Sequence, residues 1–315
     1  MTRRKPRNRA QQHLDWPPRE RYATRDVDVE SNGDTCRGTL YLPSSTENPP
    51  VVVLAPELGA DRKFGLPAVA ERLAANGYAA FTLDYRGFGA SDGDDQAIAP
   101  ARHRDDLAAA VDRVAAVEAV GDETVVSGYG LGASHAVAVA AETGGVDAVM
   151  AITPILDGRT FLRQRGRKPF LRVLAAGLRG ATVGRVRGDR EVPIAGAAAD
   201  LAPVTDKRSY LDLVDRESDW RNVTPARSLW RLARHDVTDA LDELRVPALV
   251  LAGTDDAQAP ADRVERAAER IESAASHRAA VTFVEMPADH WSVYGADFES
   301  AVGHQLAFLR DALDR

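Results

Sequence analysis

The chain has 315 residues, of which 44% are hydrophobic and 28% charged, with a formal net charge of -7. It contains no run of about 18 apolar residues, so we expect no membrane-spanning helix, and its acidic balance argues against broad nucleic-acid binding, which depends on neutralising phosphates. One cysteine, Cys36, excludes an intrachain disulfide and a zinc site built on several thiolates. We therefore expect a cytoplasmic protein with no metal or other cofactor, whose partner is a small-molecule ligand or substrate.

The N-terminal segment is strongly basic from Thr2 to Arg9. A secretory signal would continue with an apolar stretch, but residues 11–18 are mostly polar. We predict that residues 1–20 form a mostly disordered arm ahead of one domain spanning residues 21–315.

Next along the chain, Asp26–Glu30 and Thr35–Leu42 alternate polar and apolar residues on either side of Asn32-Gly33, which predicts a β-hairpin. Short apolar runs typical of buried strands then alternate with segments of helical spacing. The expected strands are 51–54, 78–83, 124–126, 146–152, 246–251 and 281–286, and the expected helices are 66–75, 104–117, 131–141, 261–275 and 298–313. This alternation predicts an α/β fold with a doubly wound, mainly parallel sheet. It breaks over residues 155–240, which we interpret as a helical, cap-like insertion.

The first chemically informative motif follows the strand that begins at Thr124. Glycines at 128 and 132 flank Gly130 between that strand and the next helix, which is the frame of a nucleophile elbow, G-x-S-x-G. The central residue of such a turn is expected to be a serine exposed at its tip. Here the nucleophile position is vacant, because a glycine has no side chain that can attack a carbonyl.

Two further motifs follow late strands. Gly253-Thr254-Asp255-Asp256 ends one strand, and Asp289-His290-Trp291 follows the last. Ligands in such sheets bind beyond the carboxyl ends of the strands, and a carboxylate followed by a histidine in these loops matches the orienting and base positions of a Ser-Asp-His triad. Asp255 is a rival to Asp256, but the spacing to Pro260 favours Asp256.

These motifs resemble segments of the α/β-hydrolase family. Two further segments share the resemblance, Asp84-Tyr85-Arg86-Gly87-Phe88-Gly89-Ala90-Ser91-Asp92-Gly93 and Thr153–Gly158. The resemblance covers nearly the whole chain after the basic arm and is nearest to the dienelactone-hydrolase-like and peptidase-like esterases. It implies that Asp256 takes the acid position and His290 the base position. It also implies that the backbone N–H groups of Leu58 and Leu131 form an oxyanion hole.

Two positions depart from the family pattern. Gly130 replaces the nucleophile, and the family's His-Gly-x-Gly is here Pro56-Glu57-Leu58-Gly59. Glu57 puts a carboxylate near the place where negative charge develops in acyl transfer, which is unfavourable electrostatics.

Several other groups carry weaker claims. Four residues are considered as replacement nucleophiles or donors: Ser134, Ser127, Ser91 and Tyr129. A packing, capping or turn role is expected of each. His103, His135 and His235 are weaker candidates than His290. The Asp92–Asp95 loop lacks the full calcium-binding spacing, and we expect the Arg159–Lys168 cluster to lie in water.

Three functions remain open at this level. The first is a catalytically impaired protein that binds a small ligand in the retained pocket. The second is a serine-independent hydrolase or lyase that uses a His290–Asp256 acid/base pair, possibly with Glu57. The third is a weak hydrolase that relies on binding and backbone donors. If the rest of the site is competent, Gly130→Ser is expected to raise esterase activity.

Overall fold

An eight-stranded sheet organises the chain in the computed structural model, which describes residues 8–274 and 280–313. The strand order is β1-β2-β4-β3-β5-β6-β9-β10. The strands are β1 (Tyr22–Ser31), β2 (Asp34–Pro43), β3 (Val51–Ala55), β4 (Ala79–Leu83), β5 (Thr124–Tyr129), β6 (Ala148–Ile152), β9 (Ala248–Gly253) and β10 (Val281–Met286). All pairs from β4 to β10 are parallel, which confirms the predicted fold class.

The N-terminal hairpin forms the antiparallel edge of the sheet. Asn32 and Gly33 both have positive φ, at 51° and 89°, as a two-residue turn of the I′ type requires. The turn sets the register that pairs Ser31 with Asp34, and β2 continues the sheet antiparallel to β4. The hairpin predicted around Asn32-Gly33 is therefore confirmed.

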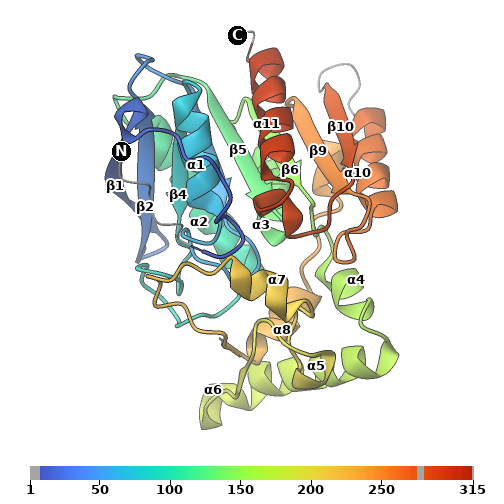
Figure 1. Ribbon diagram of the computed structural model, residues 1–315. Coiled ribbons are helices and arrows are strands. Elements are labelled where there is room, and N and C mark those ends of the chain that lie inside the picture. The colour runs from blue at the N-terminus through green and yellow to red at the C-terminus, as the bar shows by residue number, and fades with distance from the viewer. Residues whose placement is uncertain (1–7, 275–279, 314–315) are drawn as a thin grey trace.

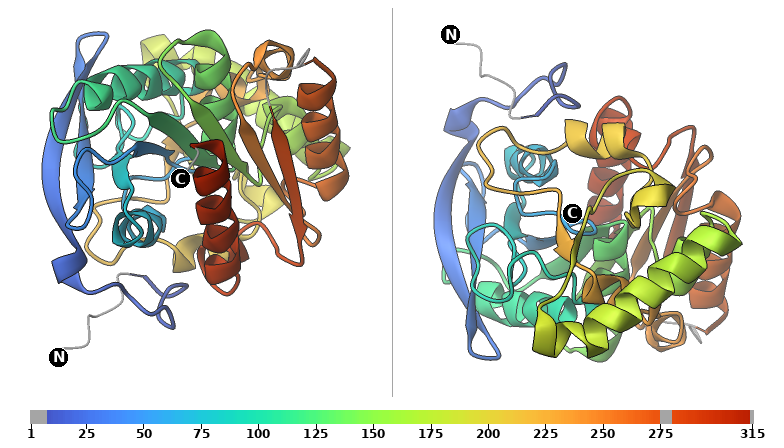
Figure 2. Two further views of the ribbon diagram at one scale, coloured as in Figure 1. Left: turned by 90° about the horizontal axis from the view of Figure 1, so that it is seen from above. Right: turned by 90° about the horizontal axis from the view of Figure 1, so that it is seen from below.

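Helices cover both faces of the sheet (Figures 1 and 2). α1 (Leu66–Ala75) and α11 (Phe298–Ala312) lie on one face, and α2 (Pro100–Ala115) and α3 (Leu131–Glu142) lie on the other. α10 (Ala261–Ala274) packs against β9 and β10, and residue 275, the predicted end of this helix, lies outside the described residues. Because both faces are covered, the central strands β3, β4, β5 and β6 are buried along their whole length.

The segment between β6 and β9 lies beyond one end of the sheet (Figure 1). It contains α4 (Gly158–Arg163), α5 (Arg167–Thr182), α6 (Gly184–Arg187), α7 (Lys207–Asp212) and α8 (Arg227–Ala233), and α9 (Ala240–Glu243) follows at its end. It also holds one short strand pair that the sequence did not predict, β7 (Glu191–Val192) with β8 (Thr224–Pro225). Strands of two residues are too short to produce an alternating pattern. We call this segment, residues 155–240, the insertion.

The sequence predicts a mostly disordered arm over residues 1–20, of which residues 1–7 lie outside the described residues, whereas the described part packs against the domain. Gln11 is 1% exposed, and its side-chain amide donates to the carbonyls of Gly65 and Tyr294 at 3.0 Å each. Leu14 is buried in the core. Gln11 therefore ties residues 8–14 to the loop before α1 and to the segment before α11. The polar composition of the arm gave no sign of this docking.

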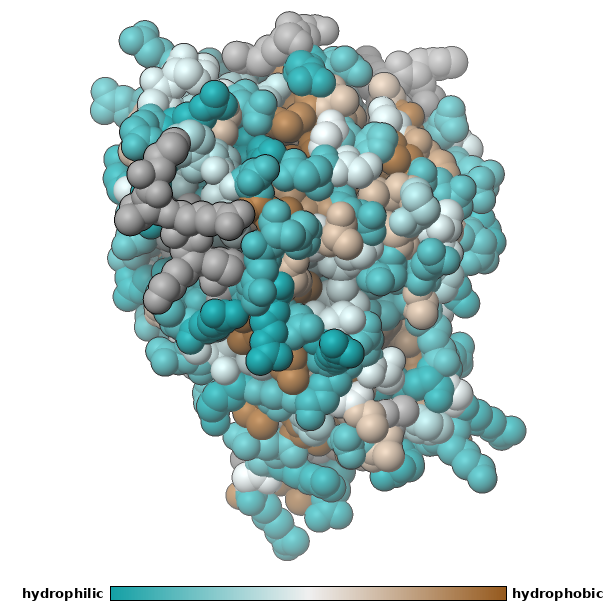
Figure 3. All heavy atoms as spheres, viewed as in Figure 1, coloured by the Kyte–Doolittle hydropathy of each residue, from teal (hydrophilic) through white to brown (hydrophobic). Residues whose placement is uncertain are grey.

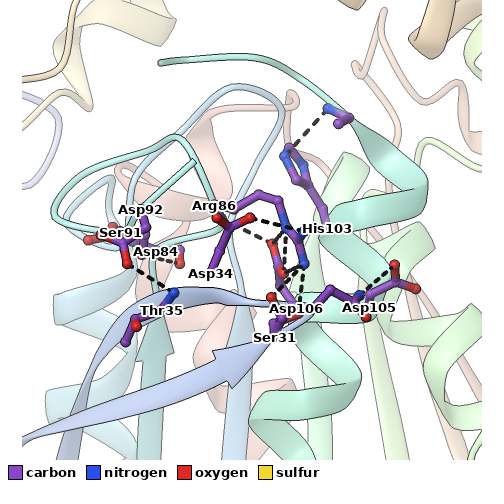
Figure 4. A network of polar contacts seen from close by, with 12 residues as sticks. Ser31, Asp34, Thr35, Asp84, Arg86, Ser91, Asp92, His103, Asp105 and Asp106 are labelled. Atoms are coloured by element: carbon purple, nitrogen blue, oxygen red, sulfur yellow. Dashed lines mark hydrogen bonds and ion pairs between the residues drawn. The ribbon is translucent and has the colours of Figure 1, made fainter. Parts of the chain in front are cut away.

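The Asp84–Gly93 loop after β4 is held by buried polar contacts (Figure 4). The Arg86 guanidinium donates to Asp106 from Nε at 2.9 Å and to the Ser31 hydroxyl at 2.7 Å. Asp84 accepts from the Ala90 backbone N–H at 3.1 Å, and a side chain at Gly89 would overlap the Asp84 carboxylate. The family-like pattern of this loop thus fixes its shape against α2 and the hairpin.

No helix in the described ranges is both long enough and apolar enough to cross a membrane. The face seen in Figure 3 is mostly hydrophilic, with hydrophobic residues scattered between the charged ones.

Candidate active site

The turn between β5 and α3 is tight and leaves no room for a side chain at its tip. Gly130 has φ 52° and ψ -114°, a combination that L-residues rarely adopt. Its N–H donates to the Ile152 carbonyl at 3.0 Å, and its carbonyl accepts from the Ile155 N–H at 2.9 Å. The strand–turn–helix frame that the sequence predicted here is therefore present, pinned to the neighbouring strand β6.

The Glu57 carboxylate fills the space in front of Gly130. Its Oε1 accepts from the backbone N–H of Leu58 at 2.7 Å and of Leu131 at 3.0 Å. A Cβ added at Gly130 would lie only 1.9 Å from Oε2 and 2.2 Å from Oε1. The two N–H groups that the resemblance implied as oxyanion donors thus both donate to Glu57 Oε1. Sequence reasoning put Glu57 near these donors, but not on them.

His290 and Asp256 are brought together as predicted. His290 Nδ1 lies 2.7 Å from Asp256 Oδ2, and Asp256 Oδ1 accepts from the backbone N–H groups of Gln258 and Ala259 at 2.7 and 2.8 Å. Asp255, the rival, is exposed to solvent. The loop after β9 therefore fixes the Asp256 carboxylate and aims it at the histidine.

His290 also faces Glu57. Its Nε2 lies 3.3 Å from Glu57 Oε2, and both side chains are about 2% exposed or less. Within residues 8–274 and 280–313, neither of these two buried atoms has a hydrogen-bond partner. The histidine therefore lies between two carboxylates, Asp256 on Nδ1 and Glu57 on Nε2.

Asp256, His290 and Glu57 form a row of three side chains, and the charges of this row favour a protonated imidazole. Burial alone would lower the pKa of His290, but the Asp256 and Glu57 carboxylates outweigh burial and raise the pKa to about 10. At neutral pH the imidazole of His290 is therefore protonated. Burial, with the Glu57 charge nearby, also raises the pKa of the Tyr210 and Tyr294 hydroxyls, which stay protonated.

Three of the alternative nucleophiles or donors have hydrogen-bond partners, and the hydroxyl of the fourth, Ser127, is buried with none among the described residues. Ser134 Oγ donates to the Leu131 carbonyl at 2.6 Å, and Ser91 Oγ donates to the Asp84 carbonyl at 2.8 Å. Ser127 is buried within β5. Tyr129, considered as an exposed donor, is instead fully buried, and its hydroxyl pairs with Gln305. It points into the packing between β5 and α11.

The other three candidate histidines form a buried cluster apart from the Glu57 row. His135 Nδ1 lies 3.1 Å from the Tyr85 hydroxyl, His103 stacks on the Tyr85 ring, and His235 Nε2 lies 2.7 Å from Ser134 Oγ. Burial lowers the pKa of His103 and of His235 to about 4, so both are neutral at pH 7. These residues pack α2, α3 and the end of α8 together.

Two residues of the insertion that the sequence did not single out hold the Glu57 loop in place. The Tyr210 hydroxyl donates to the Leu58 carbonyl at 2.8 Å, and Trp220 Nε1 donates to the Gly59 carbonyl at 2.7 Å. Ile194 packs so closely that a side chain at Gly59 would meet it at 2.9 Å. The only sequence signal for this role was the presence of aromatic residues in a segment without strand alternation.

A cavity of about 270 Å³ opens beside the row. It is bounded by His290 and Trp291, by Asp255 of the β9 loop, and by Phe161 and Arg165 of the insertion. Arg165 is held there by the carbonyls of residues 202 and 203. Contrary to the expectation that the Arg159–Lys168 cluster lies in water, this member is partly buried, and burial lowers its pKa to about 10.

Comparisons with known proteins agree with this architecture. The family described as "Serine aminopeptidase, S33" matches residues 52–282. The chain is 28% identical over 293 residues to the quorum-quenching protein AidA of Acinetobacter baumannii, covering 90% of this chain and 94% of AidA. Two solved structures superpose closely: DcsB in complex with its substrate analogue (TM-score 0.76, 19% identity, 92% and 99% of the two chains) and the α/β hydrolase GrgF from Penicillium sp. sh18 (TM-score 0.75, 19% identity, 93% and 100%). The likeness to the dienelactone-hydrolase branch stays a prediction. The match over more than half of the chain means that this protein belongs to the serine aminopeptidase S33 family and has the α/β-hydrolase fold.

Proposed function

We propose that this protein is a serine-independent hydrolase in which the Glu57 carboxylate acts from the place of the missing serine side chain. The observation that carries the proposal is the 1.9 Å separation between Glu57 Oε2 and a Cβ built on Gly130. A serine at 130 and the present Glu57 conformation exclude each other. The two departures from the family pattern are therefore one coupled change, whereas independent decay would leave no reason for them to fit together.

Each member of the row has a part in this proposal. Glu57 Oε2 is the reactive oxygen, because Oε1 is held by the Leu58 and Leu131 N–H groups. His290 transfers protons and is oriented by Asp256, as in a Ser-His-Asp array. The Gly130 turn supplies the space that the Glu57 carboxylate occupies, instead of a nucleophile.

The test is a substrate panel of small esters, lactones, epoxides and haloalkanes, assayed with wild type, Glu57→Gln and His290→Asn. We expect at least one class to be hydrolysed, with a loss of about 100-fold or more in kcat/KM in both variants. Glu118→Gln and His304→Asn, which change residues away from the row, are matched controls and should retain wild-type rates. Turnover that is unchanged in Glu57→Gln, or no turnover of any class, would reject the proposal.

A catalytically impaired ligand-binding protein is the second candidate, and one observation favours it. Glu57 is 2% exposed and already occupies both N–H donors, so the row is closed to a substrate in this conformation. In that case a small ligand would bind in the cavity beside His290, and the substrate panel would give thermal stabilisation without product. Restoring serine alone would not revive esterase activity, because Gly130→Ser collides with Glu57.

A further inference from the structure

A cavity of about 400 Å³ lies between the first turn of α2 and the end of α8. It shares no lining residue with the cavity beside His290, so it is separate from the carboxylate–histidine row. Its volume falls within the range of about 300–1,000 Å³ that is typical of small-molecule sites. Four arginines line it, and we call it the arginine cavity: Arg102, Arg104, Arg231 and Arg234.

Acidic side chains neutralise only part of this positive charge, although the chain as a whole has a net charge of -7. Arg104 Nη1 lies 3.1 Å from Glu142 Oε1, but Arg104 Nε is buried without a hydrogen-bond partner among the described residues. Arg102 and Arg234 are exposed, and neither forms an ion pair within residues 8–274 and 280–313. Asp236, the acidic residue in the lining, already accepts two hydrogen bonds from the residue two positions further on. Two guanidinium groups of the cavity therefore have no carboxylate partner in the described part of the chain.

The end of α2 that lines the cavity adds to the positive potential. Residues 99–102 are part of the lining, and this 16-residue helix begins at Pro100. No side chain caps this end, and the first turn contains no acidic residue. The N–H groups of the first turn of a helix, together with the positive end of its dipole, attract anions. His235, a buried member of the lining, is neutral at pH 7, because burial and then the Arg104 charge lower its pKa to about 4.

We propose that the arginine cavity binds a small organic phosphate monoester. A phosphate monoester carries about 1.5–2 negative charges at pH 7, which matches the two guanidinium groups without a carboxylate partner, those of Arg102 and Arg234. Its oxygens accept several guanidinium N–H donors at once through charge-assisted hydrogen bonds. A monocarboxylate brings a single charge and would leave one of the two guanidinium groups unneutralised.

The organic part of the ligand follows from the apolar side of the cavity. Ala99, Pro100 and the half-buried Trp230 line it beside the arginines. The Arg234 guanidinium lies over the Trp230 ring, 5.8 Å from the ring centroid, so a charged donor and an aromatic surface are adjacent. A phosphate joined to a flat ring contacts both. Phenyl phosphate is therefore the probe of choice.

The test is isothermal titration calorimetry of the full chain with phenyl phosphate, inorganic phosphate and benzoate, in a buffer free of phosphate. Phenyl phosphate should bind at one site per chain, at least about 10-fold more tightly than either of the other two. Arg102→Gln/Arg234→Gln should weaken its binding at least about 10-fold, because charge-assisted hydrogen bonds are lost. Arg113→Gln/Arg310→Gln is the matched control. It removes the same charge from exposed positions outside the cavity and should bind as wild type does.

The other outcomes overturn the inference in part or in full. Binding that Arg102→Gln/Arg234→Gln leaves unchanged, or that the control variant weakens equally, overturns the site. Benzoate binding as tightly as phenyl phosphate overturns the requirement for a dianion, and inorganic phosphate binding as tightly overturns the organic part. No saturable binding at millimolar concentration overturns the whole inference.

Loss of binding is separable from loss of the fold and from the hydrolytic site. Arg102 and Arg234 are exposed and have no ion pair among the described residues, so the thermal unfolding of the double variant should match that of wild type. No residue of the Glu57 row is changed. Each result therefore bears on the arginine cavity alone and leaves the proposed hydrolysis to its own test.

Discussion

Gly130→Ala tests the steric coupling on which the site depends. The new Cβ would lie 1.9 Å from Glu57 Oε2, whereas ordinary contacts begin at 3.4 Å, so the carboxylate must move by about 1.5 Å, the difference between the two. Such a move breaks the two hydrogen bonds from Leu58 and Leu131, and Glu57 is buried, so water does not replace them.

The cost follows from these two effects. A hydrogen bond to a charged group contributes about 1.5–3 kcal/mol, so losing both lowers the free energy of unfolding by about 3 kcal/mol or more. The strained backbone at φ 52° adds about 1–3 kcal/mol for an L-residue. We expect a total of about 4 kcal/mol or more in wild type. In a Glu57→Ala background only the backbone strain remains, about 1–3 kcal/mol.

The assay is urea unfolding followed by tryptophan fluorescence for the four members of the double-mutant cycle. Gly145→Ala is the matched control, since Gly145 has φ 80° but no atom within 4 Å of its Cβ position. It should show strain alone. A coupling energy between positions 57 and 130 within about 0.5 kcal/mol of zero would refute the steric argument, because contacting residues usually couple more strongly.

Three further predictions concern the row and the loop beside it. Asp256→Asn should reduce hydrolysis by about 100-fold or more, because His290 loses its orienting carboxylate; a kcat/KM within a few-fold of wild type would contradict this. The folded pKa of His290, about 10, is raised above the ordinary 6.5, so its stabilising contribution is complete below pH 6.5 and is lost as pH rises through 10. The difference in unfolding free energy between wild type and His290→Asn should shrink over that range, and a constant difference would contradict it. Arg86→Leu leaves the buried Asp106 carboxylate without its ion pair and should lower the free energy of unfolding by about 3–5 kcal/mol. Urea unfolding measures this loss, and a loss under about 1 kcal/mol would show that the ion pair does not stabilise the fold.

Local patterns were enough to predict most of the fold. The hairpin followed from Asn32-Gly33, because a two-residue turn of the I′ type needs two positive φ values, which Asn and Gly adopt readily. The buried strands followed from their apolar runs, because helices cover both faces. The boundaries differed by a few residues, as for α2, which begins at Pro100 and not at 104. Proline fits the first turn of a helix, a signal that the helical spacing alone did not use.

The candidate site was predictable in its members but not in its arrangement. The spacing to Pro260 selected Asp256 over Asp255, and the structure joins Asp256 to His290. By contrast, the fit of Glu57 into the space over Gly130 depends on a three-dimensional contact between residues 73 positions apart. No periodicity or spacing carries that information. The aromatic residues of the insertion were a signal of some packing role, but they did not indicate that Tyr210 and Trp220 bond to the Glu57 loop.

The hydrogen bond from Trp220 to the Gly59 carbonyl also bears on the rate of access to the site. Any molecule that reaches Glu57 must first separate the insertion from this loop, breaking the Trp220 and Tyr210 contacts together. Opening of this kind often limits turnover in enzymes with covered sites. The Trp220 indole is half-buried and its N–H is bound to the Gly59 carbonyl in this structure, so opening of the loop should change the tryptophan fluorescence. Stopped flow can read that change without an added label, and a Trp220→Phe variant identifies the part that comes from this residue.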